Sequence, residues 1–214
     1  MTDPSVSEAA GFDAGYAGEQ LRRSKQPLRK VVKGFYLRSV LSLLKGPTID
    51  YGCGAGQLLA LLPAGSLGLE VNPHLIAAHT RAGLSVRQWQ ANDQGFDLAG
   101  LAPGQFKTLV ISHVLEHLLD PTAAMNRLLQ ACQRLGIERL IAVVPGAKGY
   151  ASDATHRTYI DGRYVVDHGW QQLGVYALSL QRFFPLPFEG GGKLYTYNEM
   201  QLVFDRALAG ASVA

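Results

Sequence analysis

The sequence is poor in cysteine and in long apolar runs, and each shortage excludes a class of protein. Its two cysteines, Cys53 and Cys132, form no Cys-x-x-Cys pair, which argues against a disulfide framework. No apolar run approaches the roughly 18 to 20 residues that cross a bilayer, so we expect no membrane span. The first residues lack the basic-then-apolar order of a signal peptide. We therefore expect a cytoplasmic protein with reduced, buried cysteines.

Net charge is also small, but the basic residues are unevenly placed. The formal net charge is +3, yet eight lysines and arginines crowd the segment from Arg22 to Lys45. A solvated helix face is the simplest explanation, and a surface for a phosphate-bearing or other anionic acceptor is the alternative. Because Phe35 and Tyr36 are the only aromatic residues among them, a nucleic-acid partner is not favoured.

The chain is long and apolar enough for one α/β domain. Its 214 residues, of which 47% are hydrophobic, can fill a core without a disulfide or a structural metal. The alternation of strands and helices predicts a parallel sheet with helices on both faces, whose ligands bind at the carboxyl ends of the strands. A late hairpin-like pair follows over 175–184 and 199–204. The other expected elements are strands over 48–50, 66–71, 84–89, 106–112 and 140–144, and helices over 57–62, 72–82 and 121–135.

The most informative segment is the glycine-rich turn after the first strand, Asp50-Tyr51-Gly52-Cys53-Gly54-Ala55-Gly56. Glycine permits positive φ and lets a ligand approach the backbone closely. A helix after the turn would offer its free N–H groups to an anionic part of that ligand. A dinucleotide fingerprint that starts at Gly52 requires glycine at position 57, where this chain has Gln57. A nicotinamide-dependent oxidoreductase is therefore disfavoured.

A second acidic residue ends the next expected strand, in Leu67-Gly68-Leu69-Glu70-Val71. The carboxylate of Glu70 follows the first motif by about 20 residues, the spacing at which α/β nucleoside-binding folds hold a ribose diol. The two motifs together indicate a nucleoside-type ligand.

These motifs resemble those of the class I S-adenosylmethionine (SAM)-dependent methyltransferases. Ser112-His113-Val114-Leu115-Glu116-His117-Leu118 adds the Val-Leu-Glu-His motif of one branch, and the resemblance runs from about residue 48 to 145. It implies a Rossmann-like, seven-stranded sheet with a reversed last strand. It also implies SAM as cofactor and S-adenosylhomocysteine as product. The domain itself is expected over 46–214, after an N-terminal lid or helical extension over 1–45.

The resemblance also implies which residues bind the cofactor. The glycine loop would lie along the methionine part of SAM, Glu70 would hold the ribose, and Asp50 would support the loop or the SAM amino group. Tyr16 lies in a segment that can close over SAM in related enzymes. The full implied set is Asp50, Gly52, Cys53, Gly54, Gly56, Glu70, Val71, Ser112, His113 and Tyr16.

Residues near the acceptor are harder to assign, because methyl transfer mainly needs alignment of the acceptor with the methyl group. A base is needed only when the nucleophile is protonated. His156, in a polar loop after the fifth strand, and His117 are the candidate bases. His113, Glu116 and His117 would face one side of a helical turn, whose simplest role is structural.

We expect no metal at this turn. If one were held, its ligands would be His113, Glu116, His117 and His156. Small-RNA 3′-end 2′-O-methyltransferases and ubiquinone-pathway O-methyltransferases look similar here, since they hold a metal with Glu-x-x-Glu-His. This chain has His113 in place of the first Glu.

The function expected from these observations is methyl transfer from SAM to a small-molecule or saccharide-type acceptor, at oxygen. Two alternatives stay open. One is an RNA 2′-O-methyltransferase with a metal-assisted site, and the other is a SAM-binding subunit without catalysis. The oligomeric state also stays open.

Overall fold

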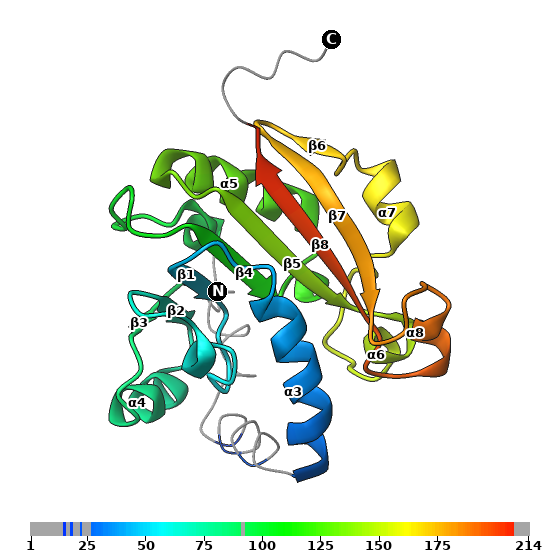
Figure 1. The fold of residues 1–214 in the computed structure, drawn as a ribbon, viewed down its shortest axis with the longest axis horizontal. Coiled ribbons are helices and arrows are strands. Elements are labelled where there is room, and N and C mark those ends of the chain that lie inside the picture. Colours follow the sequence, from blue (N-terminus) through cyan, green and yellow to red (C-terminus); the bar gives the residue numbers. More distant parts are fainter. Residues whose placement is uncertain (1–14, 16–17, 19–21, 23–26, 91–92, 208–214) are drawn as a thin grey trace, which may run out of the picture.

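An eight-stranded sheet forms the centre of the fold (Figure 1). The computed structural model describes residues 15, 18, 22, 27–90 and 93–207. The first five strands are parallel, and β8 is antiparallel to both β5 and β7. Across the sheet the order is β3 (Val86–Gln88), β2 (Leu67–Glu70), β1 (Thr48–Tyr51), β4 (Thr108–Ser112), β5 (Arg139–Pro145), β8 (Glu199–Arg206), β7 (Tyr176–Phe184) and β6 (Gln172–Leu173).

The parallel order and the reversed last strand are confirmed, but the expected number of strands was wrong. The sheet has eight strands instead of seven, because Gln172 and Leu173 pair with Ala177 and Tyr176 at its edge. A two-residue strand is too short to show the period-two alternation that identifies a strand in a sequence.

The two longest helices cover opposite faces of the sheet (Figure 1). On α3 (Pro27–Leu41), Val40 packs with Val110 of β4. On α5 (Pro121–Leu135), Leu128 packs in a second core that contains Leu109 of β4. Successive residues of β4 thus point to opposite faces and are fully buried on both, as a central parallel strand requires.

In the described part of the chain, seven short helices make the connections. Asn72 caps α4 by accepting hydrogen bonds from the backbone N–H groups of His74 and Leu75, and Pro73 is its first residue, as the sequence predicted. Within the described ranges, no helix has the length and apolar character needed to cross a membrane. The seven are η1 (Leu59–Leu61), α4 (Pro73–Arg81), η2 (Asp93–Asp97), η3 (Leu115–His117), α6 (Ala147–Ala151), α7 (Gly162–Asp167) and α8 (Gly191–Leu194).

The helix expected over 57–62 is a single 3-10 turn, Leu59–Leu61. Pro63 explains the difference, because proline disfavours the α conformation in the residue before it. Leu62 is accordingly extended, with φ −71° and ψ 153°. The glycine turn is therefore not followed by an α-helix whose N-terminus could bind an anion.

Candidate cofactor and acceptor site

The described residues that were predicted to bind the cofactor lie at the carboxyl ends of three neighbouring strands. Strand pairing places Asp50 of β1 beside Gly68 of β2 and beside Val110 of β4. Glu70 and Ser112 are the last residues of β2 and β4. Residues far apart in the sequence therefore meet at one edge of the sheet.

The glycine turn adopts a backbone that requires glycine. Gly52, Gly54 and Gly56 have φ values of +71°, +51° and +71°. The N–H groups of Gly52 and Cys53 donate to the carbonyl of Leu69, which fastens the turn to β2. A Cβ on Gly52 would lie 2.7 Å from the side chain of Val114, so a side chain would collide there in addition to being strained.

A buried histidine that the sequence analysis missed supports this turn. His79 of α4 is 3% exposed, and its Nε2 lies 2.7 Å from the carbonyl oxygen of Gly54. Because a carbonyl only accepts, Nε2 donates this hydrogen bond. A Cβ on Gly56 would lie 2.6 Å from the ring. The one available signal was spacing, since His79 follows the buried Leu75 by four residues on the same helix face.

Glu70 holds the other side of the turn with its carboxylate. One oxygen accepts from the N–H of Gly54 at 2.7 Å, and the other accepts from Val71 and Asn72 at 2.9 Å each. Glu70 is only 5% exposed. A carboxylate offers about four lone-pair sites, so these three bonds leave about one for a ligand.

Asp50, before the turn, and Cys53, within it, are both buried. Burial raises the pKa of the Cys53 thiol well above its usual range, and Asp50 and Glu70 raise it further. Cys53 is therefore a neutral thiol, and so is the fully buried Cys132, as expected for cysteines that serve as small apolar side chains.

Tyr36 of α3 reaches the same edge of the sheet and was not predicted to do so. Its hydroxyl lies 2.5 Å from Oγ of Ser112, at the end of β4. Burial raises the pKa of Tyr36 well above its usual range, and the nearby carboxylate of Glu199 adds to the effect. The hydroxyl thus stays protonated and can serve as a hydrogen-bond donor.

His113 follows β4 in a strained conformation, with φ +56°, which is uncommon for a residue other than glycine. Its Nδ1 lies 3.2 Å from Oε1 of Glu116, and its Nε2 lies 3.0 Å from Oε1 of Glu199. Burial favours the neutral ring, but the carboxylates of Glu199 and Glu116 outweigh it and raise the pKa of His113 to about 10. Both ring nitrogens are engaged by carboxylates, so His113 is a poor metal ligand.

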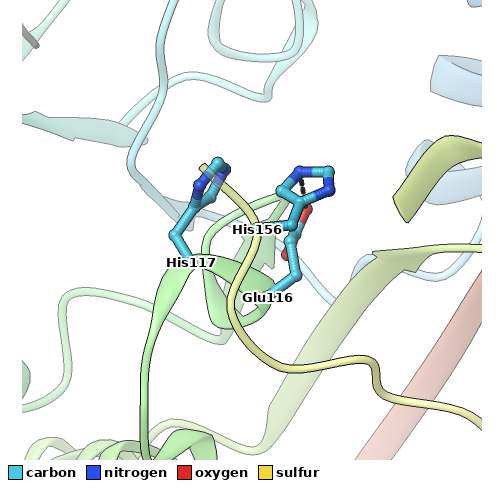
Figure 2. Close-up of side chains that lie close together, drawn as sticks. All are labelled: Glu116, His117 and His156. Atoms are coloured by element: carbon cyan, nitrogen blue, oxygen red, sulfur yellow. Dashed lines mark ion pairs between the residues drawn. The ribbon is translucent and has the colours of Figure 1, made fainter. Parts of the chain in front are cut away.

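Glu116 also forms a cluster with His117 and His156 (Figure 2). One potential ligand atom from each residue lies within 4.8 Å of the others. The N–H groups of Arg157 and Thr158 both donate to the carbonyl of Glu116, which draws the loop after α6 onto η3. This backbone pairing brings His156 to the motif that precedes it by about 40 residues.

Hydrogen bonds assign the ring protons in the cluster. Nδ1 of His156 lies 2.8 Å from the carbonyl oxygen of Tyr150, so Nδ1 carries the proton. Nδ1 of His117 lies 3.1 Å from Oγ1 of Thr155, whose own proton is donated to Asp153 at 2.6 Å. Nδ1 of His117 must therefore donate. In each neutral ring the free lone pair is therefore on Nε2.

Two of the three side chains in the cluster are shielded from solvent. The side chain of Glu116 is fully buried and that of His156 is 8% exposed. Burial lowers the pKa of His117, although the Glu116 carboxylate acts in the opposite direction. Among the described residues, Oε2 of Glu116 has no hydrogen-bond partner.

Two sequence-based predictions stay untested. Tyr16 lies outside the described residues, so its role as a lid stays a prediction, as does the division into 1–45 and 46–214. The last turns of α3 do pack on the sheet through Leu37 and Val40.

Comparisons with known proteins agree with the fold and the motifs. A family model described as a methyltransferase domain matches residues 49–138. The chain is 32% identical over 107 residues to the ubiquinone biosynthesis O-methyltransferase of Methylococcus capsulatus, a match that covers 47% of this chain and 43% of that protein. The chain thus spans less than half the length of the curated relatives it matches.

Two solved structures share the fold over most of the chain. The magnesium protoporphyrin IX methyltransferase of Synechocystis PCC 6803, with bound S-adenosylhomocysteine, has a TM-score of 0.59 at 15% identity and covers 96% of this chain and 100% of its own. A SAM-dependent methyltransferase from Archaeoglobus fulgidus has a TM-score of 0.60 at 17% identity and covers 91% and 100%. At these identities the likeness shows the fold alone.

The sheet order, with its reversed β8, is that of a class I methyltransferase fold. The model of the methyltransferase domain matches residues 49–138, in agreement with the resemblance seen in the sequence.

Proposed function

We propose that this protein transfers a methyl group from SAM to an oxygen atom of a small-molecule or saccharide-type acceptor. The observation that carries the proposal is the glycine turn, clamped between Glu70 and His79 at the carboxyl ends of β1 and β2. The name of the curated relatives, O-methyltransferases of ubiquinone biosynthesis, supports oxygen as the nucleophile.

The residues present fit a nucleoside ligand such as SAM. The glycine turn keeps side chains away from the backbone, and the Glu70 carboxylate faces it. A ribose diol that donates both hydroxyls to Glu70 would compete with the N–H of Gly54 for the carboxylate. Cofactor binding would then release this N–H and shift the turn. SAM, when bound, supplies a methyl group already activated by its sulfonium.

The two histidines of the cluster would take the proton from an acceptor hydroxyl. In their neutral forms His156 and His117 carry the lone pair on Nε2, and Tyr150 and Thr155 hold the rings in this tautomer. Neutral imidazole is a suitable base near neutral pH. His113 would not act as a base, because the two carboxylates beside it keep it protonated.

The test is methyl-group labelling of a cell extract with purified protein and SAM labelled in the methyl group, followed by separation of small molecules, RNA and protein. We expect label in the small-molecule fraction, lost with Glu70→Ala and lowered at least tenfold with His156→Asn. His168→Asn is the matched control, because His168 is exposed and stacks on Tyr164, away from the cluster.

The alternatives predict different outcomes of the same experiment. Label in RNA would replace the small-molecule acceptor with an RNA 2′-O-methyltransferase activity. SAM binding without transfer to any fraction would favour a non-catalytic subunit.

A further inference from the structure

The cluster of Glu116, His117 and His156 has the arrangement of a cation site. Nε2 of His156 lies 3.8 Å from Oε1 of Glu116, and the hydrogen-bonded tautomers leave a lone pair on this nitrogen. A nitrogen lone pair that faces a carboxylate oxygen at this distance is repelled by it unless a proton or a cation lies between them. The fully buried Oε2 of Glu116 also lacks a hydrogen-bond partner among the described residues, which is unfavourable for an ionised group.

The second layer around the cluster matches that of a metal centre. Histidines that bind a metal usually donate their other N–H to a carbonyl or carboxylate, which fixes the ring and its tautomer. His156 donates to the Tyr150 carbonyl, and His117 donates to Thr155, which passes its own proton to Asp153. Each ring is thus oriented by its Nδ1–H.

The donor set decides which cation fits. Two imidazole nitrogens and one carboxylate are typical of Zn²⁺ sites with an open coordination position, whereas Mg²⁺ prefers six oxygen ligands. His113 cannot extend the set, since its nitrogens lie 3.2 and 3.0 Å from Glu116 and Glu199. Its part is to position the Glu116 carboxylate, since its Nδ1 lies 3.2 Å from Oε1.

We propose that Glu116, His117 and His156 form a three-ligand site for Zn²⁺ or a similar borderline divalent cation, selective against Mg²⁺, with His113 as a positioning residue. A bound cation would occupy the Nε2 lone pairs, so in the metal-loaded protein these rings would not take the acceptor proton; the cation would instead lower the pKa of a hydroxyl that coordinates it. Its use in methyl transfer rests on the proposed function, whereas cation binding itself does not.

The test is a titration of the chelator-treated full chain with Co²⁺, whose visible absorption reports its coordination geometry. We expect the intense bands of a four-coordinate ion, removed by one equivalent of Zn²⁺ and unchanged by millimolar Mg²⁺. His117→Ala and His156→Ala should each abolish the bands, and His168→Ala should leave them unchanged. Thr155→Val keeps all three ligands but removes the acceptor of His117, so we expect it to weaken Co²⁺ binding about 10- to 100-fold.

A further variant tests whether His113 is a metal ligand. His113→Gln should retain the bands with affinity within about tenfold, because His113 is not a ligand. Loss of the bands in a folded His113→Gln variant, displacement of Co²⁺ by Mg²⁺, or no Co²⁺ bands in the wild type would each overturn the proposal. Circular dichroism of every variant shows whether it is folded.

SAM binding, measured by calorimetry on the same samples, separates this proposal from the proposed function. SAM binding without Co²⁺ bands would refute only the cation site. Co²⁺ bands without SAM binding would refute only the methyltransferase activity.

Discussion

The contact between His79 and the glycine turn gives a sharp prediction for Gly56→Ala. Gly56 has φ +71°, and a Cβ there would lie 2.6 Å from the ring of His79. Gly83 provides the matched control, because its φ is +74° and a Cβ there would have no neighbour within 4 Å. The two substitutions thus share the conformational cost, and only one adds a collision.

The expected magnitudes follow from these two contributions. Placing alanine in a left-handed conformation costs about 1–2 kcal/mol, which is the whole effect expected for Gly83→Ala. At Gly56 the ring must also move and give up its 2.7 Å hydrogen bond to Gly54. Leaving the N–H of the buried His79 ring unsatisfied costs about 1–3 kcal/mol more, so Gly56→Ala should lower the free energy of unfolding by about 2–5 kcal/mol.

Urea unfolding of a double-mutant cycle measures the collision directly. In a His79→Ala background the ring is absent, so the cost of Gly56→Ala should fall to that of Gly83→Ala. Calorimetry should show weaker SAM binding by Gly56→Ala and unchanged binding by Gly83→Ala. If Gly56→Ala costs the same with and without His79, the described support of the turn is wrong.

Three further predictions concern stability. In Asp205, burial favours the neutral acid, but hydrogen bonds from Arg139 and other partners outweigh it and lower the pKa below 3.8. This contribution is full above pH 3.8 and is lost as the pH falls further, so Asp205→Asn should lower the melting temperature at pH 7 and by less at pH 2.5. Asn72→Ala removes the cap of α4 and should cost about 1 kcal/mol in urea unfolding. Gly68→Ala places a Cβ 2.5 Å from Leu59 and should cost about 1–3 kcal/mol by the same measurement; no loss would contradict this packing.

The fold could be predicted where the pattern was long or carried a specific signal. Helix α5 has the predicted bounds, because its apolar face is regular and Asp120 and Gly136 cap its ends. The 3-10 turn η1 was predicted too long, because the apolar run before Pro63 suits either helix type. Strand β6 was missed because two residues carry no pattern.

The residues of the site that belong to sequence motifs could be predicted. Those that reach the site only through tertiary contacts were missed. Gly52, Gly56 and Glu70 belong to a local motif whose spacing indicates a ligand. Tyr36 reaches the site from a helix before it and His79 from a helix after it. Spacing places His79 on the buried face of α4, but nothing in the immediate sequence of either residue indicates that it contacts the site. Such residues are found only when the packing of the helices is known.

The measurement that tests the central claim most directly is calorimetric titration of the purified protein with SAM, S-adenosylhomocysteine and NADH. We expect micromolar SAM binding, about −8 kcal/mol at a Kd of 1 μM. Glu70→Ala and Gly54→Val should weaken it, whereas Glu138→Ala, an exposed glutamate paired with Lys107, should not. A folded wild-type protein that binds no SAM, or that binds NADH in its place, would contradict the account.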